Sequence, residues 1–164
     1  MPRVPTIAVI GPGGDVAAAL IKSAREVGAL LARDGACVVT GGLDGVMAAA
    51  AQGATQAGGQ ALGLLPGEDP DAGDEHLSIR IATGLGQVRN VVLVNASDGV
   101  IAIGGSWGTL SEIALAMRAG KPVVCMHGWS IADNTGRPVL LPTADTASEA
   151  VGTLQHALQW QPKT

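Results

Sequence analysis

The sequence predicts an α/β fold, in which a doubly wound parallel sheet is covered by helices on both faces. Short runs rich in Val, Ile and Leu alternate along the chain with Ala-rich segments of helical composition. These short runs lack polar alternation, which is typical of strands that are buried on both faces. The length of 164 residues suits one domain, and no linker or strict repeat divides it, so we expect a single domain over residues 1–164.

The first half of the chain predicts three strands and two helices. Each strand is a short run rich in β-branched or aliphatic residues that ends at a glycine or a proline. The helices are rich in alanine, which has the highest helix propensity. The strands are expected at Thr6–Ile10, Cys37–Thr40 and Gln60–Leu65, and the helices from Asp15, as the N-cap, to about Arg33 and over residues 46–57.

The second half continues the alternation after a loop. Pro66–His76 has the composition of a loop and contains several acidic residues. The apolar run of Gly99–Ile103 predicts a strand that is buried on both faces. Beyond the loop, strands are expected at residues 79–83, Gly99–Ile103 and 122–126, and helices at residues 87–97, 110–120 and 146–160.

Composition and charge argue against several classes of partner. The net charge of −4 disfavours a broad electrostatic grip on nucleic acid or on an anionic membrane. The chain has no Phe or Tyr and only three Trp, so a platform that stacks successive bases is not expected. No apolar run reaches the ~18 residues of a membrane span, and the N-terminus reaches glycine too soon for a signal peptide. We therefore expect neither a nucleic-acid nor a membrane partner.

The cysteines and histidines predict a cytoplasmic protein without a metal site. Cys37 and Cys125 lie in apolar runs, where a thiol usually acts as a small hydrophobic side chain. This pattern fits a reducing compartment, and no spacing of metal ligands is visible. His76 and His127 stand without apparent partners.

Three glycine turns follow predicted strands and open predicted helices. They are Gly11–Asp15, Gly41–Gly45 and Gly104–Thr109. In a parallel sheet all three lie at the carboxyl edge, where such folds bind ligands. Glycine lets the backbone approach an anion, and a helix N-terminus offers free N–H groups. The turns together favour a phosphate ester or another oxyanion, although βα turns also need glycine for their own geometry.

Two familiar nucleotide motifs are absent from the sequence. A P-loop requires a Gly-Lys-Ser/Thr sequence, and the chain has none. The dinucleotide fingerprint requires a third glycine, but Val16 follows Gly11 and Gly13 at that position. The second strand ends in Thr40 and not in an acidic residue. A nicotinamide cofactor is therefore disfavoured.

The order of three motifs resembles a known family. "GGLDGVMAAAAQGA", "TGLGQVRN" and "IGGSWGTLSEI" are similar to motifs of the LOG-like Rossmann proteins, the so-called lysine decarboxylase family. The resemblance covers about Ile7 to Met126 and implies a Rossmann-like sheet. One branch of the family consists of phosphoribohydrolases that release a free base and ribose 5-phosphate from nucleoside 5′-monophosphates. The other contains the molybdenum cofactor carrier proteins, which this sequence resembles more closely.

The resemblance implies a set of site residues. In the enzyme branch Glu112 would stabilise a positively charged ribosyl centre or assist water, and Arg89 would hold phosphate or orient the sugar. Ile103 and Asn90 replace the proline and the lysine of the enzymes' signature, and the turn is one residue longer. The predicted ligand-binding residues are Gly11, Gly13, Gly41, Gly42, Arg89, Asn90, Gly104, Gly105, Ser106, Trp107, Gly108 and Thr109.

Several of these residues also have structural interpretations. Glu112 is spaced to form a capping box with Thr109, which would make it part of a helix cap. Arg89 and Asn90 could be ordinary helix residues. Trp107 could cover a flat heterocycle or shield the turn. Asp44 could bond a ribose hydroxyl, although Asp in a glycine-rich turn usually stabilises the turn itself.

Two functional hypotheses follow. The first is a binding protein for a phosphorylated, nucleotide-like ligand, with the molybdenum cofactor as a candidate, and the second is a LOG-type phosphoribohydrolase. A third and weaker hypothesis, single-stranded DNA binding, is disfavoured by the acidic charge balance. We also expect a homodimer or homotetramer, because 47% of the residues are hydrophobic and only 15% are charged. The Ala-rich helices near residues 45–57 and 110–119 could pack across a two-fold axis.

Overall fold

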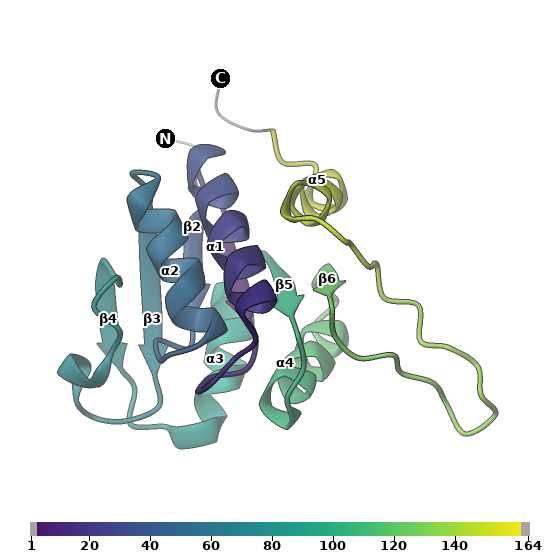
Figure 1. The fold of residues 1–164 in the computed structure, drawn as a ribbon. Helices are drawn as coiled ribbons and strands as arrows, with labels where there is room; N and C mark the ends of the chain where they lie inside the picture. Colours follow the sequence, from purple (N-terminus) through teal and green to yellow (C-terminus); the bar gives the residue numbers. More distant parts are fainter. Residues whose placement is uncertain (1–2, 162–164) are drawn as a thin grey trace.

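Six parallel strands form one sheet in the computed structural model, which describes residues 3–161 (Figure 1). The strand order is β4-β3-β2-β1-β5-β6, so the order reverses between β1 and β5. In the register of the central strands, Ile7 pairs with Val38 on one side and with Gly99 on the other. The strands are β1 (Thr6–Ile10), β2 (Cys37–Thr40), β3 (Gln60–Leu65), β4 (Ile79–Ala82), β5 (Gly99–Ile103) and β6 (Val123–Met126).

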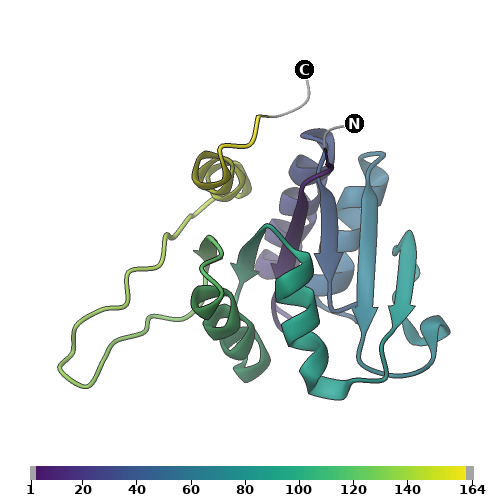
Figure 2. The same cartoon turned by 180° about the vertical axis from the view of Figure 1, so that it is seen from behind.

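Helices cover both faces of the sheet, which confirms the doubly wound α/β prediction. One face carries α1 (Ala18–Arg33), α2 (Val46–Gln56) and α5 (Ala147–Leu158) (Figure 1). The other carries α3 (Arg89–Ala96) and α4 (Trp107–Arg118) (Figure 2). Two short 3₁₀ helices, η1 (Pro70–Ala72) and η2 (Gly86–Val88), lie in the segments before β4 and α3. Within residues 3–161, no helix combines the length and the apolar character needed to cross a membrane.

The sheet separates two hydrophobic cores. Side chains of alternate strand residues point to opposite faces, so Ile7 and Val9 join the core under α1, α2 and α5. Ala8 and Ile10 join the core under α3 and α4. Every residue of β5 is buried, as expected for a central strand of a parallel sheet.

Helices α1 and α2 cross at very short range because each has a glycine at the contact. A Cβ atom on Gly28 would lie 2.1 Å from the Ala50 carbonyl oxygen, and one on Gly53 would lie 2.0 Å from the Arg25 carbonyl oxygen. Ala50 and Ala54 of α2 are fully buried. The small residues of α2 therefore pack against α1 within the chain and offer no surface for the expected contact across a two-fold axis. A homo-oligomer would need another surface.

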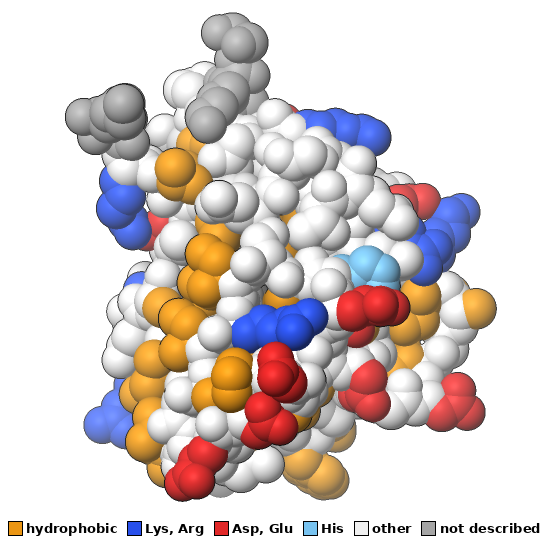
Figure 3. All heavy atoms as spheres, turned by 90° about the vertical axis from the view of Figure 1, so that its left-hand side faces the viewer, with side chains coloured by type: hydrophobic (Ala, Val, Ile, Leu, Met, Phe, Trp, Pro, Cys, Tyr) orange, Lys and Arg blue, Asp and Glu red, His pale blue; other side chains and the backbone are white. Residues whose placement is uncertain are grey.

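Exposed apolar side chains gather on the side of the molecule formed by β4 and α3. In β4, Ile79 and Ile81 are 43% and 42% exposed, because no helix covers the outer part of this edge strand. Val91 and Val92 of α3 and Val88 just before it are also exposed. Figure 3 views the molecule from the β4 side and shows hydrophobic side chains in a continuous run. We call Ile79, Ile81, Val88, Val91 and Val92 the α3 face.

The first turns of two helices differ from the sequence predictions. Helix α1 begins at Ala18, and its N-cap is Ala17 rather than Asp15, which is exposed and lies outside the helix. Helix α4 begins at Trp107 because Ser106 has an extended backbone and accepts a hydrogen bond from the Thr109 N–H at 3.2 Å. Thr109 is therefore inside the helix, and the predicted capping box with Glu112 is wrong.

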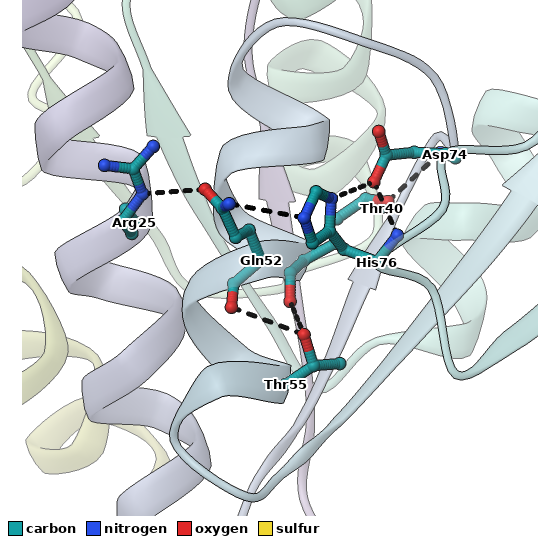
Figure 4. Close-up of polar contacts among 8 residues, drawn as sticks. Arg25, Thr40, Gln52, Thr55, Asp74 and His76 are labelled. Atoms are coloured by element: carbon teal, nitrogen blue, oxygen red, sulfur yellow. Dashed lines mark hydrogen bonds and ion pairs between the residues drawn. The ribbon is translucent and has the colours of Figure 1, made fainter.

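A chain of polar contacts connects the loop before β4 with helices α1 and α2 (Figure 4). Arg25 Nε donates to Gln52 Oε1 at 2.8 Å, and Gln52 Nε2 lies 3.2 Å from His76 Nε2. His76 Nδ1 lies 2.9 Å from Asp74 Oδ1. The arginine can only donate, so the glutamine amide must donate to His76, whose proton is then on Nδ1. The prediction that His76 lacks partners is wrong.

The same loop reaches the second glycine turn. The Asp74 N–H donates to the Gly42 carbonyl oxygen at 3.0 Å. No group of three or more potential metal ligands forms among residues 3–161. The Gln52–His76–Asp74 contacts therefore position a loop beside the carboxyl edge of the sheet.

Candidate functional site

The three glycine turns lie together at the carboxyl edge, as the parallel order predicts. Gly11–Asp15 follows β1 and Gly104–Thr109 follows β5, so these two turns flank the point where the strand order reverses. Ligands of open α/β sheets bind in the crevice at this point. Gly41–Gly45 follows β2, the next strand in the sheet.

Several of the glycines have a structural role, either in close packing or in the backbone conformation of the turn. A Cβ atom on Gly11 would lie 2.5 Å from the Ile103 carbonyl oxygen, and one on Gly13 would lie 2.6 Å from Asp44 Oδ1. Gly42 and Gly104 have φ values of +78° and +70°, which favour glycine. Packing and backbone conformation therefore explain these glycines without a ligand, so the glycines alone do not indicate an anion site.

Asp44 stabilises the turns themselves. Its Oδ1 accepts a hydrogen bond from the Gly14 N–H at 2.9 Å, which links the turn after β2 to the turn after β1. This geometry agrees with the turn interpretation of Asp44 rather than with a contact to ribose.

Arg89 is the side chain that points most clearly to an anion. It is the first residue of α3 and only 7% exposed, and its guanidinium lies against Gly41. A Cβ atom on Gly41 would lie 2.5 Å from Arg89 Nη1, so glycine is needed at this position to make room for the guanidinium. Its Nε–H is buried and has no hydrogen-bond partner among residues 3–161. Such a donor is costly to bury unless an acceptor arrives.

Glu112 faces Arg89 from α4. The shortest distance between them joins Arg89 Nη1 and Glu112 Oε1 at 3.8 Å, which is an ion pair too long for a hydrogen bond. Glu112 is 7% exposed, and this burial raises its pKa from 4.5 to about 7, although the charge on Arg89 opposes the shift. Burial also lowers the pKa of Arg89, with Glu112 acting in the opposite direction. The ion pair thus compensates only part of the cost of burying the two charged groups.

Asn90 connects the starts of α3 and α4. It is 6% exposed, and its Nδ2 donates to Ser111 Oγ at 3.4 Å. Ser111 Oγ in turn donates to the Gly108 carbonyl oxygen at 2.7 Å in the first turn of α4. The N-termini of the two helices therefore lie side by side, and a groove of about 500 Å³ runs past Asn90 and Ser111.

The first turn of α4 carries the remaining predicted residues. The hydroxyls of Ser106 and Thr109 lie 2.9 Å apart, and Thr109 is almost fully buried. Trp107 is 78% exposed and contacts Trp129, with 5.4 Å between the ring centroids. Trp129 was missed in the sequence analysis. It could have been found, because the chain has only three tryptophans and this one closely follows the strand predicted at residues 122–126.

Comparison with known proteins identifies the family. The sequence model of the SLOG cluster4 family matches residues 4–155. The chain belongs to this family. The match confirms the resemblance to LOG-like proteins, and the solved structures below agree with its placement near the molybdenum cofactor carrier branch.

Other proteins resemble the chain in sequence or in structure. A protein of Archaeoglobus fulgidus is 42% identical over 120 residues, which are 73% of this chain and 78% of that protein. The molybdenum cofactor binding protein of Rippkaea orientalis superposes with a TM-score of 0.85 at 34% identity, over 95% of this chain and 98% of that one.

A second solved structure is equally similar. The molybdenum cofactor carrier protein of Chlamydomonas reinhardtii gives a TM-score of 0.85 at 34% identity, over 96% of this chain and 99% of that one. DNA processing protein A of Streptococcus pneumoniae is 19% identical, with a TM-score of 0.67 over 91% of this chain and 61% of that one. The last likeness concerns the fold alone.

Proposed function

We propose that this member of the SLOG cluster4 family binds a phosphorylated, nucleotide-like ligand and carries it without transforming it. The molybdenum cofactor is the candidate ligand, because two proteins of the same fold and about one-third sequence identity are named for binding or carrying it. The observation that supports the proposal most directly is the buried Arg89 guanidinium with an unpartnered Nε–H.

Three features of the surroundings favour phosphate as the missing acceptor. Arg presents a planar fork of donors that matches phosphate oxygens and forms strong, charge-assisted hydrogen bonds. The N-termini of α3 and α4 lie side by side, and the start of each helix adds positive potential. Gly41 leaves the space in which the guanidinium lies. These features suit a dianionic phosphoryl group better than a neutral ligand.

The residues around Glu112 favour carriage over hydrolysis. A stabiliser of a positive ribosyl centre must be ionised, but burial raises the pKa of Glu112 to about 7, so it is partly protonated at neutral pH. Asn90 and Ile103 replace the lysine and the proline of the enzymes' signature. Phosphoribohydrolase activity remains the second candidate function, because a carboxyl group beside an anion site is also what that reaction requires.

The two functions separate in an assay of base release. We expect no free base from a panel of nucleoside 5′-monophosphates incubated with the wild type or with Glu112→Gln, as measured by chromatography. The substitution nearly preserves side-chain shape and removes the charge. Release by the wild type that falls on the order of a hundredfold in Glu112→Gln would establish the enzyme instead. The carrier role predicts that mass spectrometry of the purified protein finds a phosphorylated pterin that is bound and unaltered.

The α3 face supports the expectation of a homodimer or homotetramer. Its five apolar residues are all exposed, and one of them, Val88, also lines the groove past Asn90. Apolar patches of this kind commonly become buried in oligomers. We expect light scattering at micromolar concentration to give at least twice the chain mass, and Val91→Asp to reduce it towards the monomer. Leu140→Asp, at an 85% exposed position outside this face, is the matched control. A monomeric wild type would contradict the proposal.

The remaining partner and location predictions rest on charge and on the thiols. A net charge of −4 supports a small-molecule ligand rather than nucleic acid. Both Cys37 and Cys125 are free, which is compatible with the proposed cytoplasmic location.

A further inference from the structure

Two indole rings stand at the entrance to helix α4. Trp107 is its first residue, and Trp129 lies in the loop that follows β6, the neighbour of β5 in the sheet. The ring planes are inclined at 38° with 5.4 Å between their centroids, within the range of an attractive aromatic pair. Both rings are therefore at the carboxyl edge, beside the turn that precedes α4.

The pair is arranged so that one ring supports the other. Trp129 is partly buried and packs against the core under α3 and α4. Trp107 rests on it and is 78% exposed, so most of its surface has no partner within the chain. A chain without Phe or Tyr has thus placed two of its three Trp side by side, with one of them open to solvent.

The Trp129 ring also has an unsatisfied polar atom. Its Nε1–H is buried and has no hydrogen-bond partner among residues 3–161. A Cβ atom on Gly105 would lie only 2.6 Å from this nitrogen, so the absence of a side chain at Gly105 lets the indole N–H approach the turn. A buried donor beside a helix N-terminus points to a missing acceptor at this turn.

Polar contacts connect this pair with the Arg89 site. Gly108, next to Trp107, accepts a hydrogen bond from Ser111, and Ser111 accepts one from Asn90. Asn90 follows Arg89 in the first turn of α3. The indoles and the guanidinium therefore belong to adjoining parts of one surface, which would contact different portions of one ligand.

We propose that Trp107 stacks on the planar heteroaromatic ring of the phosphorylated ligand, while Trp129 holds Trp107 in place and turns its N–H towards the same ligand. This inference rests on the proposed function, and it adds that the ligand class is a phosphate ester that carries a flat bicyclic ring. Stacking on an indole face is tolerant of ring identity, since every such ring has a π-face. Arg89 then recognises the phosphate, and the tryptophans select for the ring.

Calorimetry with three probes tests the ring contact. Inorganic phosphate has no ring or sugar, ribose 5-phosphate has no aromatic ring, and guanosine 5′-monophosphate has both a sugar and a flat bicyclic base. We expect the wild type to prefer guanosine monophosphate over ribose 5-phosphate. Trp107→Ala should reduce that preference about fivefold to a hundredfold, the range for loss of one stacking contact. Its affinities for the other two probes should stay unchanged.

Two further variants make the result specific. Trp129→Phe keeps an aromatic support but removes the N–H, so we expect a smaller loss of the same preference. Trp160→Phe, outside the site, should show the same ring preference as the wild type. The fluorescence of this variant comes from Trp107 and Trp129 alone, and guanosine monophosphate should quench it. That quenching should weaken when Trp107→Ala is added.

The outcomes separate this inference from the proposed function. If both Trp107→Ala and the wild type bind phosphate and show the same preference for guanosine monophosphate over ribose 5-phosphate, only the stacking contact is overturned. Absence of phosphate binding in the wild type would overturn the Arg89 site. A change of mass in light scattering, with ring preference unchanged, would assign Trp107 to a contact between copies of the chain and would also overturn the stacking role.

Discussion

Arg89→Lys is expected to weaken the binding of inorganic phosphate by about tenfold or more. Charge-assisted hydrogen bonds contribute about 1.5–3 kcal/mol each, and lysine keeps the charge but loses the planar fork that holds two oxygens together. The buried position of Arg89 against Gly41 leaves little room for water to substitute for the lost donor. Calorimetric titration with phosphate measures the effect, and thermal unfolding checks that the variant folds.

The matched control for this prediction is Arg33→Lys. Arg33 ends α1 on the opposite side of the sheet from α3, is exposed, and makes no contact with the proposed site. Its substitution should leave phosphate affinity unchanged. Equal affinities for phosphate in Arg89→Lys and Arg33→Lys would remove the main support for an anion site at this edge of the sheet.

The fold followed from local patterns because parallel strands are buried on both faces. Gly99–Ile103 is apolar at every position, and the structure buries all of it. The helix starts were predicted less well. A cap depends on backbone conformation. Ser and Thr are both good caps, so nothing in the sequence indicated that Ser106 would have the extended backbone of a cap while Thr109 would lie inside the helix.

The site was only partly predictable, because its members come from different elements. Arg89 and Glu112 were named separately, from the family resemblance, but their pairing arises from the packing of α3 against α4. Trp129 was missed because its loop meets the Gly105 turn only in three dimensions. The glycines were identified correctly as turn residues, yet the structure gives several of them a packing role that no composition argument could separate from ligand binding.

The pH dependence of stability is expected to reveal the unusual carboxyl group of Glu112. Its pKa is raised in the folded protein, from 4.5 to about 7, so the folded state holds the proton more tightly than the unfolded state. The favourable contribution is complete below pH 4.5 and is lost as the pH rises towards 7. The difference between the two pKa values corresponds to about 3 kcal/mol.

Glu112→Gln isolates this contribution, because glutamine does not titrate and other groups cancel in the comparison. Urea unfolding of both proteins between pH 4.5 and pH 8 should show the free energy of unfolding of the wild type falling relative to that of the variant by about 3 kcal/mol. The expected sign is opposite to that of an ordinary ion pair, whose carboxylate has a lowered pKa and stabilises the fold more as the pH rises.

A wild type that gained stability relative to Glu112→Gln over this range would mean that attraction to Arg89 has a larger effect on the pKa of Glu112 than burial has. Glu112 would then be ionised at neutral pH, as the phosphoribohydrolase mechanism requires, and the preference for a carrier would lose its electrostatic basis.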